Sequence, residues 1–154
     1  MTDMPLFRDN FLLAQPHDQP DAPAIAPARP EEIDPSRLLL LDEGHCLADQ
    51  ALAACNQRRD NVAPLLGATS LATVSRLVAS GQGLTLIPEI AAPVEGRGLR
   101  LDRFSDPEPG RTIGLVTRRG TDQDTWPKTI GDLMLIAGQR ATKANVGAGA
   151  VLPQ

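Results

Sequence analysis

Residues 44–55 read GHCLADQALAAC and hold both cysteines of the chain, together with one of its two histidines. They follow the apolar run 38–41, which predicts a buried strand. From Cys46 onward, Ala, Leu, Gln and Asp favour a helix. Cys46 is therefore expected in the first helical turn, where unpaired backbone N–H groups and the positive end of the helix dipole favour a thiolate.

The helix separates the two thiols. Nine residues at ~100° each amount to ~900°, so Cys46 and Cys55 point to opposite sides, and a rise of ~1.5 Å per residue places their Cα atoms about 13–14 Å apart. A disulfide needs Cα atoms within roughly 7 Å, so a bridge requires the helix to come apart.

Apolar spacing along this helix predicts a core stripe made of Leu47, Ala51, Ala54 and Cys55. The opposite, polar face carries Cys46, Asp49 and Gln50. Cys46 is then the attacking thiol and Cys55 a buried resolving thiol. Taken alone, these residues favour a simpler interpretation, two unrelated structural thiols, because free buried cysteines are common.

Four segments point to a known family. Residues 42–51, 68–71, 81–88 and 108–116 resemble, in the same order and with similar spacing, the OxyR family of LysR-type regulators, which sense hydrogen peroxide. The likeness extends roughly over residues 4–137. The Gly-His-Cys segment with a second cysteine nine residues later is specific to this family, whereas Gly-x-Gly-x-x-Leu-x-Pro at 81–88 is typical of LysR-type effector domains in general.

The resemblance implies an α/β fold, that of the LysR substrate-binding domain, which is similar to type 2 periplasmic binding proteins. It matches mainly the second subdomain and the return to the first. The expected divisions are a partial first subdomain and crossover (1–36), the redox subdomain (37–110), a return strand and last helix (111–137), and a flexible tail (138–154). No segment matches the family's winged helix-turn-helix, so the chain is expected to be a fragment. The family's DNA-contacting residues therefore have no counterpart in this sequence.

The resemblance also implies a reversible Cys46–Cys55 disulfide, in which Cys46 is the peroxide-reactive thiol and Cys55 the resolving thiol. Arg111 falls where the family has an arginine that approaches the sensing thiol, and a guanidinium there would stabilise the thiolate and the leaving hydroxide. Without the resemblance, Arg111 is a surface charge before a strand.

Two further residues near Cys46 each have two interpretations. His45 would hold peroxide or share a proton, or else it is a loop residue that caps the helix, and the residues alone favour neither. Asp49, one turn after Cys46, would accept a proton during disulfide formation, or it is a first-turn acid that suits the helix dipole.

Composition limits the classes of protein and of binding site that this chain can represent. Hydrophobic residues make up 42% and charged residues 22% of the 154 residues, and the net charge of −4 provides no basic surface for a phosphate backbone. The sequence shows neither an apolar run of ~18–20 residues nor a signal peptide, which indicates a cytoplasmic protein without membrane contact. Two cysteines nine apart and two distant histidines do not match zinc-ligand spacings, and no cofactor is indicated.

The partners expected from the resemblance are hydrogen peroxide, a dithiol reductant such as glutaredoxin, a second copy in the full-length protein, and DNA only through the missing helix-turn-helix. Such a protein is not an enzyme.

Two alternative functions stay open. A thiol peroxidase would show turnover with a reductant, although the chain lacks CxxC. A metabolite-binding LysR-type domain with incidental cysteines would bind an organic acid regardless of Cys46→Ser.

Coarser patterns predict the remaining elements. Thr69 or Ser70 is the expected N-cap of a helix that Gly81 ends, and Arg58-Arg59 reads as a solvated helix end. The predicted strands are 11–14, 37–41, 84–87, 99–104 and 112–117, with a proline-rich crossover at 15–35, a short helix at 89–92 and a last helix at 125–137. The alternation of strands and helices predicts parallel strand pairing.

Overall fold

A computed structural model describes residues 2–17, 29–42, 44–62, 68–118, 120 and 125–143. The strands are β1 (Thr2–Pro16), β2 (Thr85–Pro88), β3 (Leu99–Asp102) and β4 (Gly110–Thr117). The helices are α1 (Cys46–Ala54), α2 (Leu71–Ala79), α3 (Ala92–Glu95) and α4 (Trp126–Lys143). Single 3-10 turns are η1 (Pro30–Glu32), η2 (Pro35–Arg37), η3 (Arg59–Asn61) and η4 (Glu89–Ala91).

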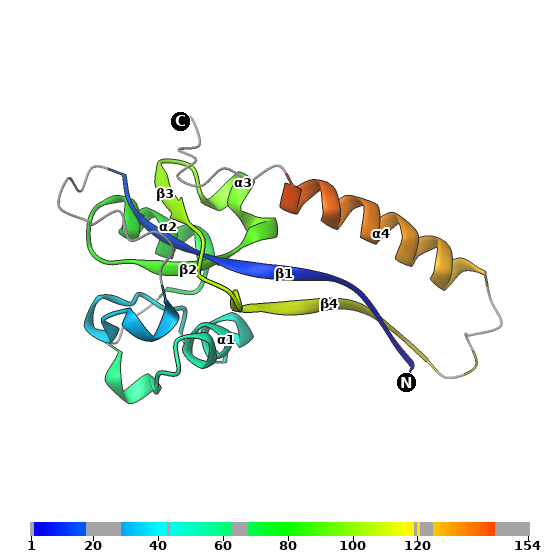
Figure 1. Ribbon diagram of the computed structural model, residues 1–154, viewed down its shortest axis with the longest axis horizontal. Coiled ribbons are helices and arrows are strands. Elements are labelled where there is room, and N and C mark those ends of the chain that lie inside the picture. Colours follow the sequence, from blue (N-terminus) through cyan, green and yellow to red (C-terminus); the bar gives the residue numbers. More distant parts are fainter. Residues whose placement is uncertain are drawn as a thin grey trace.

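The long strand β1 is the centre of a four-stranded sheet in which β2 and β3 flank its C-terminal half and β4 pairs with its N-terminal half. Its residues 11–14 are all buried, as befits a strand covered on both faces. β1 and β4 continue as a ribbon beyond the body of the molecule, with α4 alongside (Figure 1).

The predicted parallel pairing is wrong, because β2, β3 and β4 all run antiparallel to β1. The alternation rule assumes that consecutive strands become neighbours, whereas here each later strand returns to the same first strand.

The predicted strand 37–41 is not a strand, although its residues 38–41 are buried. Leu38 forms a single parallel bridge with Leu84, and Leu39 N–H donates to the Leu84 carbonyl at 2.8 Å. Beyond this bridge, the Leu39 carbonyl accepts from the Thr85 hydroxyl at 2.7 Å. The four leucines 38–41 still form part of the core beneath α1 and α2.

Helix α1 begins at Cys46 as predicted, but its core stripe is turned relative to the predicted one. The buried positions are Ala48, Ala51 and Leu52, followed by Cys55 just after the helix. Leu47 and Ala54 lie half-buried at the edges of the core. These four buried positions still follow the i, i+3, i+4, i+7 spacing of an amphipathic helix. The helix is rotated about its axis relative to the prediction, so that Ala48 and Leu52 face the core in place of Leu47 and Ala54.

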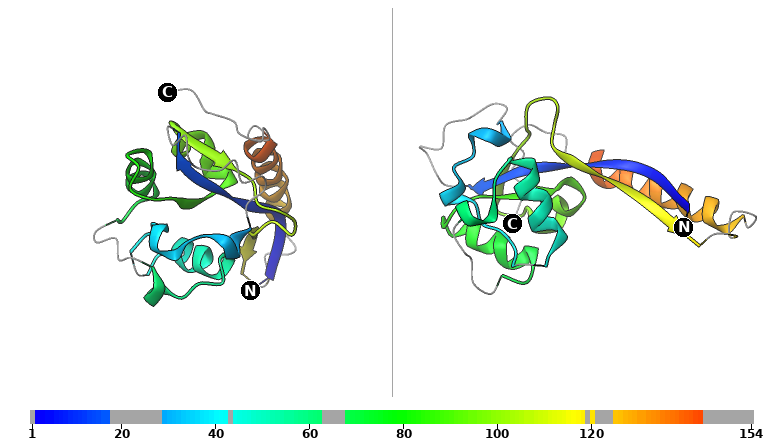
Figure 2. Two further views of the ribbon diagram at one scale, coloured as in Figure 1. Left: turned by 60° about the vertical axis from the view of Figure 1, so that its left-hand side comes forward. Right: turned by 90° about the horizontal axis from the view of Figure 1, so that it is seen from below.

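Helix α2 confirms its predicted N-cap, since the Ser70 hydroxyl accepts from Thr73 N–H at 3.2 Å. Helix α4 is longer than predicted and continues to Lys143, so the predicted flexible tail (138–154) begins within a helix, while residues 144–154 lie outside the described part of the chain. The views in Figure 2 show α4 beside the β1–β4 ribbon, away from α1. No helix in the described ranges is long and apolar enough to cross a membrane.

Candidate functional site

The two thiols lie at opposite ends of α1. Cys46 is the first residue of the helix and is exposed, whereas Cys55 follows its last residue and is fully buried. Both are free thiols. The structure therefore places the two cysteines as predicted, with one accessible to a small oxidant and the other held in the core.

Burial, with a smaller contribution from the Glu31 carboxylate, raises the pKa of the Cys55 thiol to about 11. At neutral pH Cys55 is then almost entirely protonated and a poor nucleophile in this conformation.

This shift predicts a dependence of stability on pH. Because the folded pKa lies above the ordinary value of 9.0, the folded state holds the Cys55 proton more tightly. The stabilisation is complete below pH 9 and is lost between pH 9 and about 11, where the free energy of unfolding should fall by about 2–3 kcal/mol. Urea titrations across this window measure it, and the absence of tyrosine removes one competing titration.

The matched control for this titration is Cys55→Ala, which should lose the Cys55 contribution and give a flatter profile between pH 9 and 11. Equal slopes in the parent chain and in the variant would contradict the assignment.

His45 and Asp49 flank Cys46 on the same end of α1. His45 is the N-cap, and it caps through its backbone, because its carbonyl accepts from Ala48 N–H at 2.9 Å while its side chain makes no capping bond. Asp49 is exposed and pairs with Arg59 at 3.8 Å. Arg59 also donates to the Leu41 carbonyl at 3.4 Å, so the prediction of a solvated side chain holds for Arg58 and is wrong for Arg59.

Arg111 reaches α1 from β4. Its Nη1 donates to Gln50 Oε1 at 3.3 Å, and its Nε donates to Asp9 Oδ2 at 3.0 Å. Gln50 stands four residues after Cys46, one helical turn along the same face. The structure thus brings the guanidinium of Arg111 to the polar face of α1.

Asp9 and Gln50 were not among the predicted site residues. Asp9 lies directly opposite Arg111 in the β1–β4 ladder, and its side chain is fully buried. One signal existed in the sequence: strand periodicity places Asp9 on the same face as Phe11 and Leu13. The predicted strand covers only residues 11–14, whereas β1 spans Thr2–Pro16, so the prediction does not reach Asp9.

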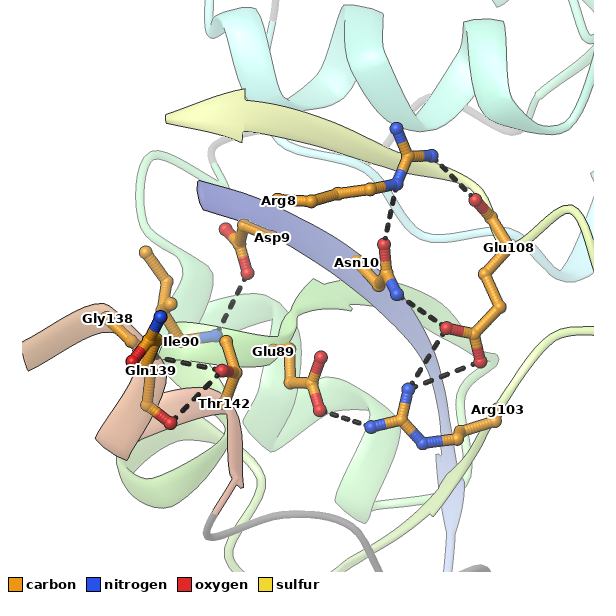
Figure 3. A network of polar contacts seen from close by, with 10 residues as sticks. All are labelled: Arg8, Asp9, Asn10, Glu89, Ile90, Arg103, Glu108, Gly138, Gln139 and Thr142. Carbon is orange, nitrogen blue, oxygen red and sulfur yellow. Dashed lines mark hydrogen bonds and ion pairs between the residues drawn. The ribbon is translucent and has the colours of Figure 1, made fainter. Parts of the chain in front are cut away.

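A polar network continues on the other side of Asp9 (Figure 3). Asp9 Oδ1 accepts from Ile90 N–H at 3.1 Å, which ties η4 to β1. Nearby, Arg103 bridges Glu89 and Glu108. Burial raises the pKa of Glu89 even though Arg103 contacts it. In the described part of the chain, no three His, Cys, Asp or Glu side chains are grouped as a metal site.

An open groove of about 930 Å³ runs beside the second half of α1. Gln50, Ala53 and Ala54 form one wall, and the segments 29–32 and 105–110 form much of the rest. The groove therefore adjoins the Arg111–Gln50 contact rather than the Cys46 sulfur.

Comparison with known proteins identifies the family of this chain. The LysR substrate binding domain matches residues 2–126. A probable hydrogen peroxide-inducible genes activator of Mycobacterium avium is 40% identical over 154 residues, and the match covers 93% of this chain and 47% of the relative. The chain thus spans about half the length of this curated relative.

Two solved structures of OxyR from Corynebacterium glutamicum have the same fold. A peroxide-bound cysteine-to-serine mutant is 30% identical with a TM-score of 0.82, covering 99% of this chain and 49% of that one. The oxidized form is 26% identical with a TM-score of 0.65, again over 99% of this chain and 49% of the other. With the profile match over residues 2–126, these findings show that the chain belongs to the LysR substrate-binding domain family.

Proposed function

We propose that this chain is the peroxide-sensing part of an OxyR-type transcriptional regulator, and that it switches through a reversible Cys46–Cys55 disulfide. One observation carries the proposal: a single nine-residue helix holds an exposed thiol at its start and a buried thiol at its end. The names of its relatives, which describe peroxide-inducible gene activators, support the same function.

The proposed reaction has two steps. The Cys46 thiolate attacks one oxygen of hydrogen peroxide, the O–O bond breaks, and a sulfenic acid forms while hydroxide leaves and takes up a proton as water. The Cys55 thiol then loses its proton and displaces the sulfenic oxygen as a second water, so that the S–S bond forms. A dithiol reductant returns both sulfurs to thiols.

Each neighbouring residue has a proposed part in this chemistry. Arg111, which reaches the same helix face, stabilises the thiolate and the leaving hydroxide. His45 beside Cys46 hydrogen-bonds peroxide or passes a proton. Asp49 accepts the proton released during disulfide formation, and it also pairs with Arg59 at 3.8 Å.

The proposal extends to the longer protein. Residues 37–110 form the redox subdomain, DNA is bound by a separate helix-turn-helix, and the protein works in the cytoplasm as a homo-oligomer that glutaredoxin or a similar dithiol protein reduces. It is a sensor that reacts once per oxidation event, not a peroxidase that turns over.

Peroxide treatment followed by peptide mass spectrometry tests the function. The parent chain should form an intramolecular Cys46–Cys55 disulfide that dithiothreitol reverses. Cys55→Ser should stop at sulfenic acid on Cys46, and Cys46→Ser should remain unoxidised under the same exposure. Oxidation of Cys55 ahead of Cys46, or a bond only between chains, would contradict the proposal.

A further inference from the structure

Asp9 lies at the middle of β1, and its carboxylate side chain is fully buried. A buried carboxylate is tolerated only when its charge is compensated and its oxygens are hydrogen-bonded. Asp9 meets both conditions, because Oδ1 accepts from Ile90 N–H and Oδ2 accepts from Arg111 Nε. Its position is therefore held from two sides.

The fixed carboxylate in turn orients Arg111. The guanidinium is planar, so a bond at Nε restricts the plane in which Nη1 lies. In that plane Nη1 reaches Gln50 Oε1 at 3.3 Å, on the turn of α1 that follows Cys46. Arg111 remains a quarter exposed, which leaves it open to a small polar ligand.

We infer that Asp9 is a positioning residue for the peroxide reaction at Cys46: it holds the guanidinium of Arg111 against the polar face of α1. This inference rests on the proposed function. Asp9 itself touches neither peroxide nor the reacting sulfur, and it acts through Arg111.

The test compares two reactions of the same thiol. In a Cys55→Ser background, Cys46 is oxidised by hydrogen peroxide, with the sulfenic acid trapped by dimedone, and is alkylated by iodoacetamide at the same pH. Both rates depend on access to Cys46 and on its thiolate fraction, but only peroxide releases hydroxide, which needs a donor. The ratio of the peroxide rate constant to the iodoacetamide rate constant therefore measures how well a hydrogen-bond donor stabilises the leaving hydroxide.

Asp9→Asn should lower this ratio about tenfold, as expected for loss of a charge-assisted hydrogen bond that orients the donor. In an Arg111→Met background the same substitution should change the ratio less than about twofold, because the group through which Asp9 acts is gone. Asp3→Asn is the matched control: it removes an exposed carboxylate from the same strand and should leave the ratio unchanged.

Asp9→Glu retains the charge but moves the carboxylate by one methylene, and should give an intermediate ratio, roughly threefold below the parent. If Asp9→Asn does not fold, this variant decides, and a ratio equal to that of the parent overturns the inference. An equal drop with and without Arg111 would also overturn it. If Cys46 of the parent reacts with peroxide no faster than a cysteine peptide, the proposed function itself fails.

Discussion

Oxidation should unwind α1, and the backbone amides of residues 46–56 should then exchange with solvent at least about 100-fold faster than in the reduced chain. In the reduced state the helix holds positions i and i+9 about 13–14 Å apart, twice the Cα separation of roughly 7 Å that a disulfide allows. Closing the bond must break the hydrogen bonds that end the helix, among them Cys55 N–H to the Ala51 carbonyl at 3.1 Å and Gln57 N–H to the Leu52 carbonyl at 2.9 Å.

The energies of the two states allow such a switch. Unwinding about two turns of helix and withdrawing the small Cys55 side chain from the core costs a few kcal/mol. A disulfide that closes a loop of about ten residues returns about 2–3 kcal/mol. Two conformations of comparable energy can therefore be exchanged by one oxidation event.

Hydrogen–deuterium exchange, measured before and after peroxide and again after dithiothreitol, checks this result. Helix α2 is the internal control, because it has the same length of nine residues and contains no cysteine. Its exchange should stay constant while that of α1 rises and then returns. A fully formed disulfide with unchanged protection in residues 46–56 would rule out the unwinding mechanism.

Gly83 and Gly81 should differ in how much stability the chain loses when each is replaced by alanine. Gly83→Ala should lower the free energy of unfolding by about 3 kcal/mol or more, because overpacking against rigid backbone cannot relax easily. A Cβ at Gly83 would overlap the Arg37 carbonyl and lie 2.9 Å from Leu39 Cγ. The segment 37–39 would have to move away, breaking the 2.9 Å bond from Leu84 N–H to the Arg37 carbonyl.

Gly81→Ala is the control, two residues away in the same motif. Gly81 has φ +83° and nothing within 4 Å of the added Cβ, so the substitution should cost only about 1–2 kcal/mol for the left-handed backbone. Urea unfolding of both variants gives the comparison. Equal losses would mean that the close approach of segment 37–39 contributes nothing beyond the backbone conformation.

Much of the local structure follows from the sequence alone. Cys46 begins α1, Ser70 caps α2, and the apolar run 84–87 overlaps β2, because caps and residue periodicity act over a few neighbours. The different exposure of the two thiols follows in the same way, since their positions on the helix leave Cys46 exposed and Cys55 buried. The spacing of Gly44, His45 and the cysteines also indicates the OxyR family.

Only the tertiary structure decided which distant segments meet. The antiparallel pairing of every later strand with β1 could not be read from the order of elements, and neither could the single bridge that leaves residues 37–41 outside the sheet. The Asp9–Arg111 contact joins residues 102 positions apart, and the Arg111–Gln50 contact joins residues 61 apart. Local sequence preferences carry no information over such separations, so the surroundings of α1 depend on how the chain packs around β1.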